Sequence, residues 1–547
     1  MTLKSFLLRF RQLVLFLLTS LAVLVCAAAP AAAEQIIVLS SDGRVQRVQD
    51  RIGTLAQSPA AAADVTELAP FGSRPSPPSR PSPPSRPSRP SAPTPARARS
   101  AQTRVTVETE LARLLEEGRI TLEEHDERLA ALKDARALTR RLQGRRKLEM
   151  AAVVALIDRM AAERRLTHSR LEPLWLILEG NREWWTTGPL LSPRQRVQFA
   201  GSELIWQYMP GSGLQLHPLA NFGRLNGFWM GGRRYRTQME ALLDELLPLA
   251  VERGGGVAWE YYFTFGPARA PWVSGMAQAT ALQALARSST RLGRAEEVLP
   301  LATRGLEIFE QPPPVGVRVS SGEGAHYLLY SGDPQLRVLN GFMQSLVGLH
   351  DFATFSGDPR AVDLFDDGDR AAESEITLAD TGAWSLYSLG RVSQEATLEY
   401  HKLVVGFLDK LCTRTSEPYY CDGEARFASY LTQPPTMTIK KPRLRSGHPT
   451  RLFFDLSKMS HVDVEIRRGP RVVMKRSLGT LRRGPHFSTF TPPRSRRALS
   501  YDIAYGAVDL AGNRGVAEAT VHAKPLPPRR KPPAGRRKPP AEVKRAR

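Results

Sequence analysis

The stretch that decides the fold of this chain is LNGFMQSLVGLHDFATFSG, residues 339–357, a mostly apolar run that ends in glycine. Its large side chains stand at the helical positions i, i+3, i+4, i+7 and i+13, namely Leu339, Phe342, Met343, Leu346 and Phe352. This spacing predicts one buried face of a helix, which Gly357 can end in a left-handed turn. Asp358-Pro359 then offers an N-cap followed by proline, so a second helix is expected over residues 359–372.

A hairpin of the same design is expected earlier in the chain. The apolar residues between Met276 and Leu292 share one helical face, Gly293 can end that helix, and a partner helix is expected over 295–309. Helical periodicity continues from about Val105 to Leu431, and Thr121 with Glu124 forms a capping box. Helical hairpins are therefore the expected building unit.

Such hairpins either stack into an open solenoid or close into a ring. The two glycine turns lie about 64 residues apart, whereas tetratricopeptide repeats recur every ~34 residues. Glycine-rich connections at 211–213, 254–256 and 316–332 also interrupt the helices. Because a ring with a central cleft uses such loops to carry site residues, the pattern favours a mainly α fold, an (α/α) toroid.

Beyond Pro434 the pattern changes from helix to strand. Short alternating or apolar runs, such as Val462–Ile466 and Tyr501–Tyr505, are separated by Gly, Pro and Ser, and a last strand is expected near 516–521. This spacing predicts an all-β sandwich of immunoglobulin-like type, about ninety residues long.

The charge of the chain is concentrated in two Pro-rich segments. The 547 residues include 76 Lys and Arg against 54 Asp and Glu, a net charge of +22. About sixteen of these charges lie in residues 74–104 and 524–547, so the folded parts are expected to be only mildly basic. The segments are predicted to be extended spacers that can also bind anionic polymers of the cell envelope. An exported protein meets little nucleic acid, so no nucleic-acid partner is expected.

The first residues predict export. Lys4, Arg9 and Arg11 precede an apolar run, and Ala31–Ala33 offers a cleavage site, as in a signal peptide. A lipid anchor at Cys26 is the alternative. No later apolar run is long enough for a transmembrane helix, so a secreted or envelope-attached protein is expected. Cys412 and Cys421 are then the remaining thiols and predict a disulfide, with a metal pair as the weaker alternative.

Four local motifs in the helical part are difficult to explain by packing alone. They are Pro271–Gln278, Tyr327–Met343, Asp380–Tyr387 and Glu399–His401. In order and separation they resemble the C-terminal domain of the D-glucuronyl C5-epimerases, from about Gln207 to Leu431. The stretch at 207–215 looks like the bacterial branch of that family.

The resemblance implies an (α/α) toroid that converts glucuronic to iduronic acid units within heparan-type polysaccharides, without a metal or other cofactor. It places Tyr330, Tyr387 and Tyr400 at the positions of the three active-site tyrosines of the family. We expect Tyr400 and Tyr387 to form the proton-transfer pair and Tyr330 to be a substrate contact or alternate acid. Phenols suit this step because the proton at C5 is very weakly acidic, and a phenolate is a better matched base than an ordinary carboxylate.

The expected substrate-binding residues have polar or aromatic side chains and lie within the region of resemblance. They are Arg391, His401, Asn340, Gln278, Trp272, Gln207 and Tyr208. Three departures from the family pattern stand beside them. Leu329 replaces a glutamate, Gly390 stands where an arginine is usual, with Arg391 one residue later, and His401 lacks the usual histidine-rich continuation. A polysaccharide lyase and a catalytically silent carbohydrate-binding protein therefore remain as alternatives.

Together these patterns divide the chain into seven parts. They are a signal peptide (1–33), a short N-terminal segment (34–70), a Pro/Ser/Arg-rich linker (71–104), a helical N-terminal region (105–205), the C5-epimerase-like domain (206–433), the immunoglobulin-like sandwich (434–524) and a basic tail (525–547).

Overall fold

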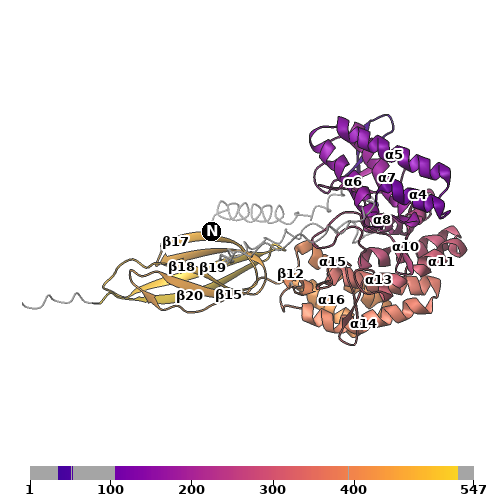
Figure 1. Cartoon of the computed structure of the whole chain (residues 1–547). Helices are drawn as coiled ribbons and strands as arrows, with labels where there is room; N and C mark the ends of the chain where they lie inside the picture. The colour runs from indigo at the N-terminus through magenta and orange to yellow at the C-terminus, as the bar shows by residue number, and fades with distance from the viewer. Residues whose placement is uncertain (1–34, 51, 53–104, 392, 528–547) are drawn as a thin grey trace, which may run out of the picture. The chain divides into compact units, whose positions relative to one another are not determined.

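The computed structural model describes residues 35–50, 52, 105–391 and 393–527, and it is rich in helix with a β-rich C-terminal part (Figure 1). The predicted signal peptide, the linker and nearly all of the basic tail lie outside the described residues. The chain forms two compact units, residues 1–372 and 373–547, and each is described by itself. None of the described helices combines the length and apolar character needed to cross a membrane.

The first unit begins with a small sheet. Strands β1 (Gln35–Leu39) and β2 (Val45–Gln49) form a hairpin, and β1 also pairs in parallel with β3 (Arg196–Phe199). Strands β4 (Trp206–Met209) and β5 (Gly213–Leu216) complete the order β2-β1-β3-β4-β5. The start of the described chain is thereby joined to the strands that precede the central helices.

Within residues 105–195, four helices lie between β2 and β3. They are α4 (Val107–Glu116), α5 (Leu122–Arg141), α6 (Gly144–Ala162) and α7 (His168–Thr187). The predicted capping box at the start of α5 is confirmed, because Thr121 N–H donates to Glu124 at 2.7 Å and Glu124 N–H donates to Thr121 Oγ1 at 3.1 Å. Arg170 on α7 forms two 2.8 Å hydrogen bonds with buried Glu260. Burial alone would raise the pKa of Glu260, but Arg170 and Arg253 hold it below its ordinary value.

Helix α10 (Gly275–Leu292) is buried on nearly every side. It packs between α8 (Pro218–Gly231) and α13 (Leu339–Ser356), and Figure 1 shows the order of these three helices. At Gly348 on α13 an added side chain would collide with the carbonyl oxygen of Ala279, so this glycine lets the two helices approach closely. The other elements are η1 (Arg233–Tyr235), α9 (Arg236–Leu246), η2 (Leu247–Leu249), β6 (Val251–Arg253), β7 (Gly256–Ala258), α11 (Ala295–Arg304), α12 (Glu307–Glu310), β8 (Arg318–Ser321), β9 (Gly324–Tyr327) and β10 (Leu336–Val338). Helix α14 (Pro359–Ala379) begins in the first unit and ends in the second.

The predicted ends of α10 and α13 are confirmed, since Gly293 and Gly357 have φ of 77° and 70°. The single helix expected over 295–309 is instead broken into α11 and α12. The break falls near Gly305, whose carbonyl accepts a hydrogen bond from the Gln278 side chain at 3.1 Å. A Cβ atom at position 305 would lie 2.8 Å from that same amide nitrogen, so a tertiary contact fixes the chain there.

The second unit contains β11 (Leu386–Gly390), β12 (Gln394–Glu395), α15 (Leu398–Thr415) and α16 (Pro418–Tyr430), followed by strands. The disulfide predicted between Cys412 and Cys421 is present and joins α15 to α16, with 4.9 Å between the Cα atoms.

Replacing both cysteines by serine is expected to lower the free energy of unfolding by about 2 to 3 kcal/mol, because the bond closes a loop of about ten residues in the unfolded chain. Urea unfolding of the oxidised protein and of the double variant measures this difference. Reducing agent should lower the stability of the wild-type protein and leave that of the variant unchanged; equal stability in all four samples would contradict the prediction.

Two sheets packed face to face form the C-terminal β-rich part. One has the order β13-β15-β18 and the other β14-β20-β19-β16-β17. Their bounds are β13 (Met437–Ile439), β14 (Leu444–Arg445), β15 (Thr450–Leu456), β16 (Ser460–Arg468), β17 (Arg471–Leu481), β18 (Gly484–Phe490), β19 (Leu499–Asp509) and β20 (Arg514–Lys524). Inward-facing side chains from both sheets, including Phe454 and Tyr505, form one shared core. The alternating burial along β15 and β16 confirms the strand pattern predicted from the sequence.

Candidate active site

Tyr387 and Tyr400 lie against each other in the second unit. Tyr387 is in β11 and Tyr400 is in the first turn of α15, and both side chains are buried. Their ring centroids are 4.8 Å apart with a 47° angle between the ring planes. The structure thus brings together the two residues that the sequence analysis predicted as a proton-transfer pair.

Local sequence fixes where each tyrosine stands. Thr397 is the N-cap of α15, and its side chain accepts the Tyr400 N–H at 3.4 Å, which places Tyr400 at the third position of the helix. Strand β11 is held by antiparallel pairing with β12, with Leu386 opposite Glu395. A short strand and a helix start therefore present the two phenols from different elements.

Trp384 and His401 form a second layer beside the two tyrosines. Their rings stack at 3.8 Å, and Trp384 Nε1 donates to the Ala396 carbonyl at 2.8 Å. His401 Nε2 lies 2.9 Å from the Phe427 carbonyl and Nδ1 lies 2.7 Å from Ser385 Oγ. Since a carbonyl only accepts, Nε2 carries the proton and Nδ1 accepts from Ser385.

These contacts bear on the predicted roles of His401. Burial, helped by the Lys458 ammonium, lowers the pKa of His401 to about 4 despite the hydrogen bond to Phe427, so the ring is neutral at pH 7. Both ring nitrogens are occupied by the protein itself. The assignment of His401 to substrate binding stays a prediction, and the contacts favour a role in positioning its neighbour Tyr400.

Because His401 is neutral when the protein is folded, we expect the protein to lose stability in acid. An unfolded histidine takes up a proton below its reference pKa of about 6.5, whereas the folded form resists protonation down to about 4. Its contribution to stability is therefore complete above pH 6.5 and is lost as the pH falls from 6.5 towards 4. Between pH 7.5 and pH 5 it should account for about 2 kcal/mol of the loss in unfolding free energy.

In His401→Gln the difference in unfolding free energy between these two pH values should shrink by that amount. The matched control is His448→Gln, since His448 is exposed. Equal pH dependence in the two variants would contradict the assignment.

The motif around Asp380 shapes a turn that leads into Trp384. Asp380 accepts the Tyr430 hydroxyl at 2.8 Å and the Gly382 N–H at 2.8 Å, and Gly382 has a φ of 78°. Burial and the Asp380 carboxylate raise the pKa of Tyr430 to about 12, so this phenol stays protonated. Asp380 and Gly382 thus have structural functions in this turn.

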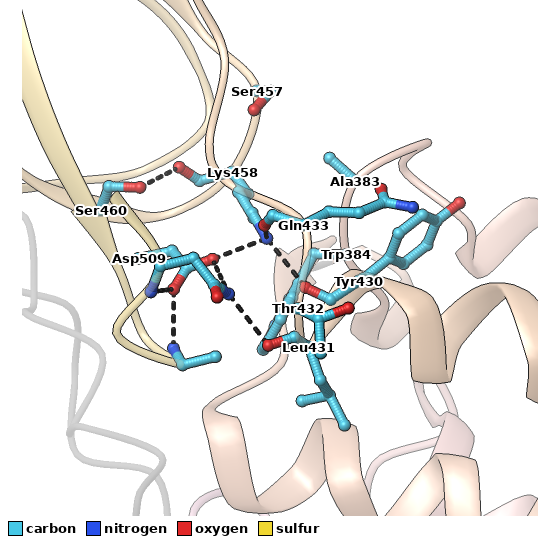
Figure 2. Close-up of polar contacts among 12 residues, drawn as sticks. Ala383, Trp384, Tyr430, Leu431, Thr432, Gln433, Ser457, Lys458, Ser460 and Asp509 are labelled. Carbon is cyan, nitrogen blue, oxygen red and sulfur yellow. Dashed lines mark hydrogen bonds and ion pairs between the residues drawn. The ribbon is translucent and has the colours of Figure 1, made fainter. Parts of the chain in front are cut away.

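Lys458 of the β-rich part reaches into the same layer (Figure 2). Its ammonium contacts Asp509 at 2.6 Å and donates to the carbonyls of Tyr430 at 2.9 Å and Gln433 at 2.5 Å. It also lies 5.2 Å from the centre of the Trp384 ring, a cation–π distance. The Lys458 and Asp509 side chains are only 2% and 1% exposed.

Glu395 forms a second link between the strand pair and the β-rich part. Its carboxylate accepts the N–H groups of Met459 at 2.9 Å and Arg483 at 3.0 Å. Trp384 and Glu395 bracket β11, so the sandwich holds both sides of the segment that carries Tyr387. Lys458, Asp509 and Glu395 could not be identified from the sequence, because their partners lie tens of residues away along the chain.

Tyr330 belongs to the first unit, where it lies among aromatic rings. Its ring is 5.1 Å from Phe265 and 5.6 Å from Trp272. Trp272 itself stacks on Tyr261 at 4.2 Å and donates through Nε1 to the Phe263 carbonyl at 2.7 Å. Trp272 therefore supports the loop beside Tyr330, and its predicted contact with substrate stays a prediction.

The other predicted binding residues differ in what their polar atoms contact. Gln278 is buried and its amide donates to the carbonyls of Val257 and Gly305 at 3.0 and 3.1 Å. In β4, the Tyr208 hydroxyl donates to Glu149 at 2.7 Å, and Gln207 Nε2 lies 3.3 Å from the Arg194 carbonyl. These three side chains bind the protein itself.

The substrate-binding roles of Asn340 and Arg391 also stay predictions. Asn340 is buried at the start of α13, and within the described residues its Oδ1 has no hydrogen-bond partner. Arg391 is exposed at the end of β11. Over the same described ranges, no group of three or more His, Cys, Asp or Glu side chains is placed to hold a metal ion.

Residues 254–429 match the protein-family model described as D-glucuronyl C5-epimerase C-terminus. The resemblance predicted from the sequence is therefore confirmed over this region. The match includes Tyr330, Tyr387 and Tyr400 and excludes Gln207 and Tyr208. It supports a general role as a carbohydrate epimerase.

Among solved structures, the chain has a weak similarity to two cellobiose 2-epimerases. That from Bacillus thermoamylovorans B4167 has 8% identity and a TM-score of 0.33, over 48% of this chain and 72% of its own. That from Spirochaeta thermophila DSM 6192 has 15% identity and a TM-score of 0.31, over 48% of this chain and 69% of its own. Similarities this low carry no argument about fold or function.

Proposed function

We propose that this protein is a D-glucuronyl C5-epimerase that removes and returns the C5 proton of a uronic acid unit within a polysaccharide. The observation that carries the proposal is the contact between Tyr387 and Tyr400, two buried phenols within the region that matches the family. The wider assignments remain proposals as well: an (α/α) toroid, an immunoglobulin-like sandwich and export. The disulfide supports export, because such bonds persist in oxidising compartments.

The chemistry requires one group to take the C5 proton and another to return a proton from the opposite face. When a phenolate takes the proton, the electrons of the C–H bond move into the adjacent carboxylate as an enolate. A phenol on the other face then donates its proton to C5 and inverts the centre. Tyr400 and Tyr387 are our proton-transfer pair.

The ring contact adds a constraint to this assignment. A sugar ring does not fit between two phenyl rings whose centroids are 4.8 Å apart, so the two hydroxyls must reach the sugar from the edges of their rings. Tyr330 keeps the role that the resemblance implies, a substrate contact or alternate acid.

A second candidate function is carbohydrate binding without catalysis, and Leu329 favours it. This residue stands where the family has a glutamate, is buried, and packs against Gly341, where a Cβ would lie 3.0 Å from the Leu329 Cβ. An apolar side chain there can neither carry nor tune a proton. A lyase, which removes the same proton and then expels the C4 substituent, is the remaining alternative.

Incubating the protein with defined uronans in D2O separates the three functions. Deuterium at C5 with inverted product supports the epimerase. New absorbance from an unsaturated uronate supports the lyase, and binding with neither change supports the silent protein. Absence of C5 deuterium on every uronan that the protein binds would overturn the proposed function.

A further inference from the structure

The charge of the folded chain is divided unevenly between its parts. Residues 434–523 contain 17 Lys and Arg against 6 Asp and Glu, a net charge of +11. Residues 105–433 contain 36 against 42, a net charge of −6. The mild positive net charge expected for the folded parts is therefore the sum of a basic sandwich and an acidic helical region. Every one of those 17 basic residues except Lys458 is exposed.

The outer face of the five-stranded sheet does not account for this excess. It carries Asp463, Glu465, Asp502 and Glu518, which are four of the six acidic residues. Basic residues oppose them in register, with Lys475 opposite Glu465 and Arg467 opposite Asp502. This face is close to neutral, so the surplus of positive charge lies elsewhere on the sandwich.

The outer face of the three-stranded sheet instead presents two phenyl rings beside a guanidinium. Phe453 of β15 and Phe487 of β18 are directly opposite in register, with ring centroids 5.7 Å apart. They are 43% and 49% exposed. Arg451 lies 4.7 Å from the centre of the Phe487 ring. We call Arg451, Phe453 and Phe487 the aromatic face.

Two basic loops meet at one end of this sheet. The Gly447 N–H donates to the Pro492 carbonyl at 2.8 Å, which joins the segment between β13 and β15, including β14, to the loop after β18. The exposed cations of these loops are Lys441, Arg443, Arg445, Arg494, Arg496 and Arg497. The acid on the face itself, Asp455, pairs with Lys440 at 3.0 Å. Among the described residues none of these six cations has an acidic partner, so the aromatic face is flanked by positive charge.

We propose that the aromatic face binds an anionic polysaccharide, and this identification of the ligand rests on the proposed function. Apolar faces of sugar rings stack on the two phenyl rings, and carboxylates along the polymer bind Arg451 and the arginines of the two loops. Held by this second site, the polymer is supplied to the catalytic region at a raised local concentration.

Other occupants fit these observations less well. The linker and tail of the chain are themselves basic, so they are repelled. An anionic membrane would need apolar groups at a protruding loop tip, whereas Phe453 and Phe487 lie in the middle of their strands. A flat face with rings at its centre suits an extended chain that lies across it.

The test is affinity electrophoresis of the full chain in gels that contain alginate, polyglucuronic acid or neutral dextran. Phe453→Ala/Phe487→Ala should weaken binding to at least one of the two uronans by at least about tenfold. The matched control is Val508→Ala/Val516→Ala, which removes exposed apolar side chains from the outer face of the other sheet and should bind like wild type. Melting temperatures should stay close to wild type in both variants, because all four side chains are exposed.

Several outcomes would overturn the proposal. These are failure of the wild-type protein to bind either uronan, equal weakening in both double variants, equal binding of dextran, or stronger binding to phosphatidylglycerol vesicles or single-stranded DNA. If, without polymer, the Phe double variant has a lower apparent mass than the wild-type protein, the aromatic face binds a second copy of the chain instead. C5 exchange on a uronate tetrasaccharide should be unaffected in the Phe double variant, so loss of polymer binding and failure of the proposed function are separable.

Discussion

Tyr400→Phe should lower incorporation of deuterium at C5 by at least about a hundredfold, because a general acid-base group typically contributes 10² to 10⁴ in rate. The substitution removes the hydroxyl that exchanges the proton and leaves the ring that packs against Tyr387. The Thr397 cap binds the backbone of residue 400, so the helix start is retained. Turnover by mass spectrometry of the product measures the effect, and substrate binding should change little.

The matched control for this variant is Tyr501→Phe. Tyr501 is also a buried tyrosine of the second unit, in the core of the sandwich, and its hydroxyl has no hydrogen-bond partner among the described residues. Its removal should leave exchange unchanged. A Tyr400→Phe protein that exchanges at the wild-type rate, or that loses stability together with activity, would contradict the proton-transfer role.

The rates of C5 exchange and of inversion, measured in tyrosine variants, identify the phenol that acts on the second face of the sugar. If Tyr387 is the second group, Tyr387→Phe should lower inversion and Tyr330→Phe should mainly weaken substrate binding. If the contact between the rings of Tyr387 and Tyr400 keeps both on one side of the sugar, Tyr330→Phe should abolish inversion while exchange from the other face continues. The two patterns are mutually exclusive, so the roles of all three tyrosines follow from one set of variants.

Features that depend on neighbours in sequence were predictable. The glycine caps of α10 and α13, the capping box of α5 and the disulfide each involve residues at most nine positions apart, and local periodicity or composition reveals them. The adjacency of His401 to Tyr400 was visible too. Its tautomer was not, because that depends on Ser385 and the Phe427 carbonyl.

Features that depend on tertiary contacts could not be predicted from the sequence. The break between α11 and α12 follows from a hydrogen bond to Gln278, 27 residues away. The contacts of Glu395 span 64 and 88 residues and involve backbone N–H groups, which have no signature in sequence. The uneven charge could have been found by counting each domain separately. The pairing of Phe453 with Phe487 required the register of β15 and β18.

Lys458→Met should destabilise the protein by about 3 to 5 kcal/mol, the range found when one partner of a buried ion pair is removed. The substitution keeps the length of the side chain but removes the ammonium. It leaves the Asp509 carboxylate buried without its cation and removes a donor from the carbonyls of Tyr430 and Gln433. Urea unfolding of the full chain measures the loss.

The double variant Lys458→Met/Asp509→Asn distinguishes an ion pair from simple packing. Asparagine keeps an acceptor for the Ala511 and Asn513 N–H groups, which donate to Asp509 at 3.0 and 2.8 Å, and it carries no charge. Because the uncompensated charge causes most of the cost, the double variant should be more stable than Lys458→Met alone. A loss below about 1 kcal/mol in Lys458→Met would show that solvent screens the pair.

The same substitution links the sandwich to the candidate active site. Lys458 lies over Trp384, and Trp384 stacks on His401, which is next to Tyr400. If this layer holds the tyrosines in place, Lys458→Met should lower C5 exchange at temperatures where the protein is still folded, and the double variant should recover part of it. A Lys458→Met protein that is folded but less stable could still exchange at the wild-type rate. That result would show that Lys458 contributes only to stability, and that Thr397 and His401 position Tyr400.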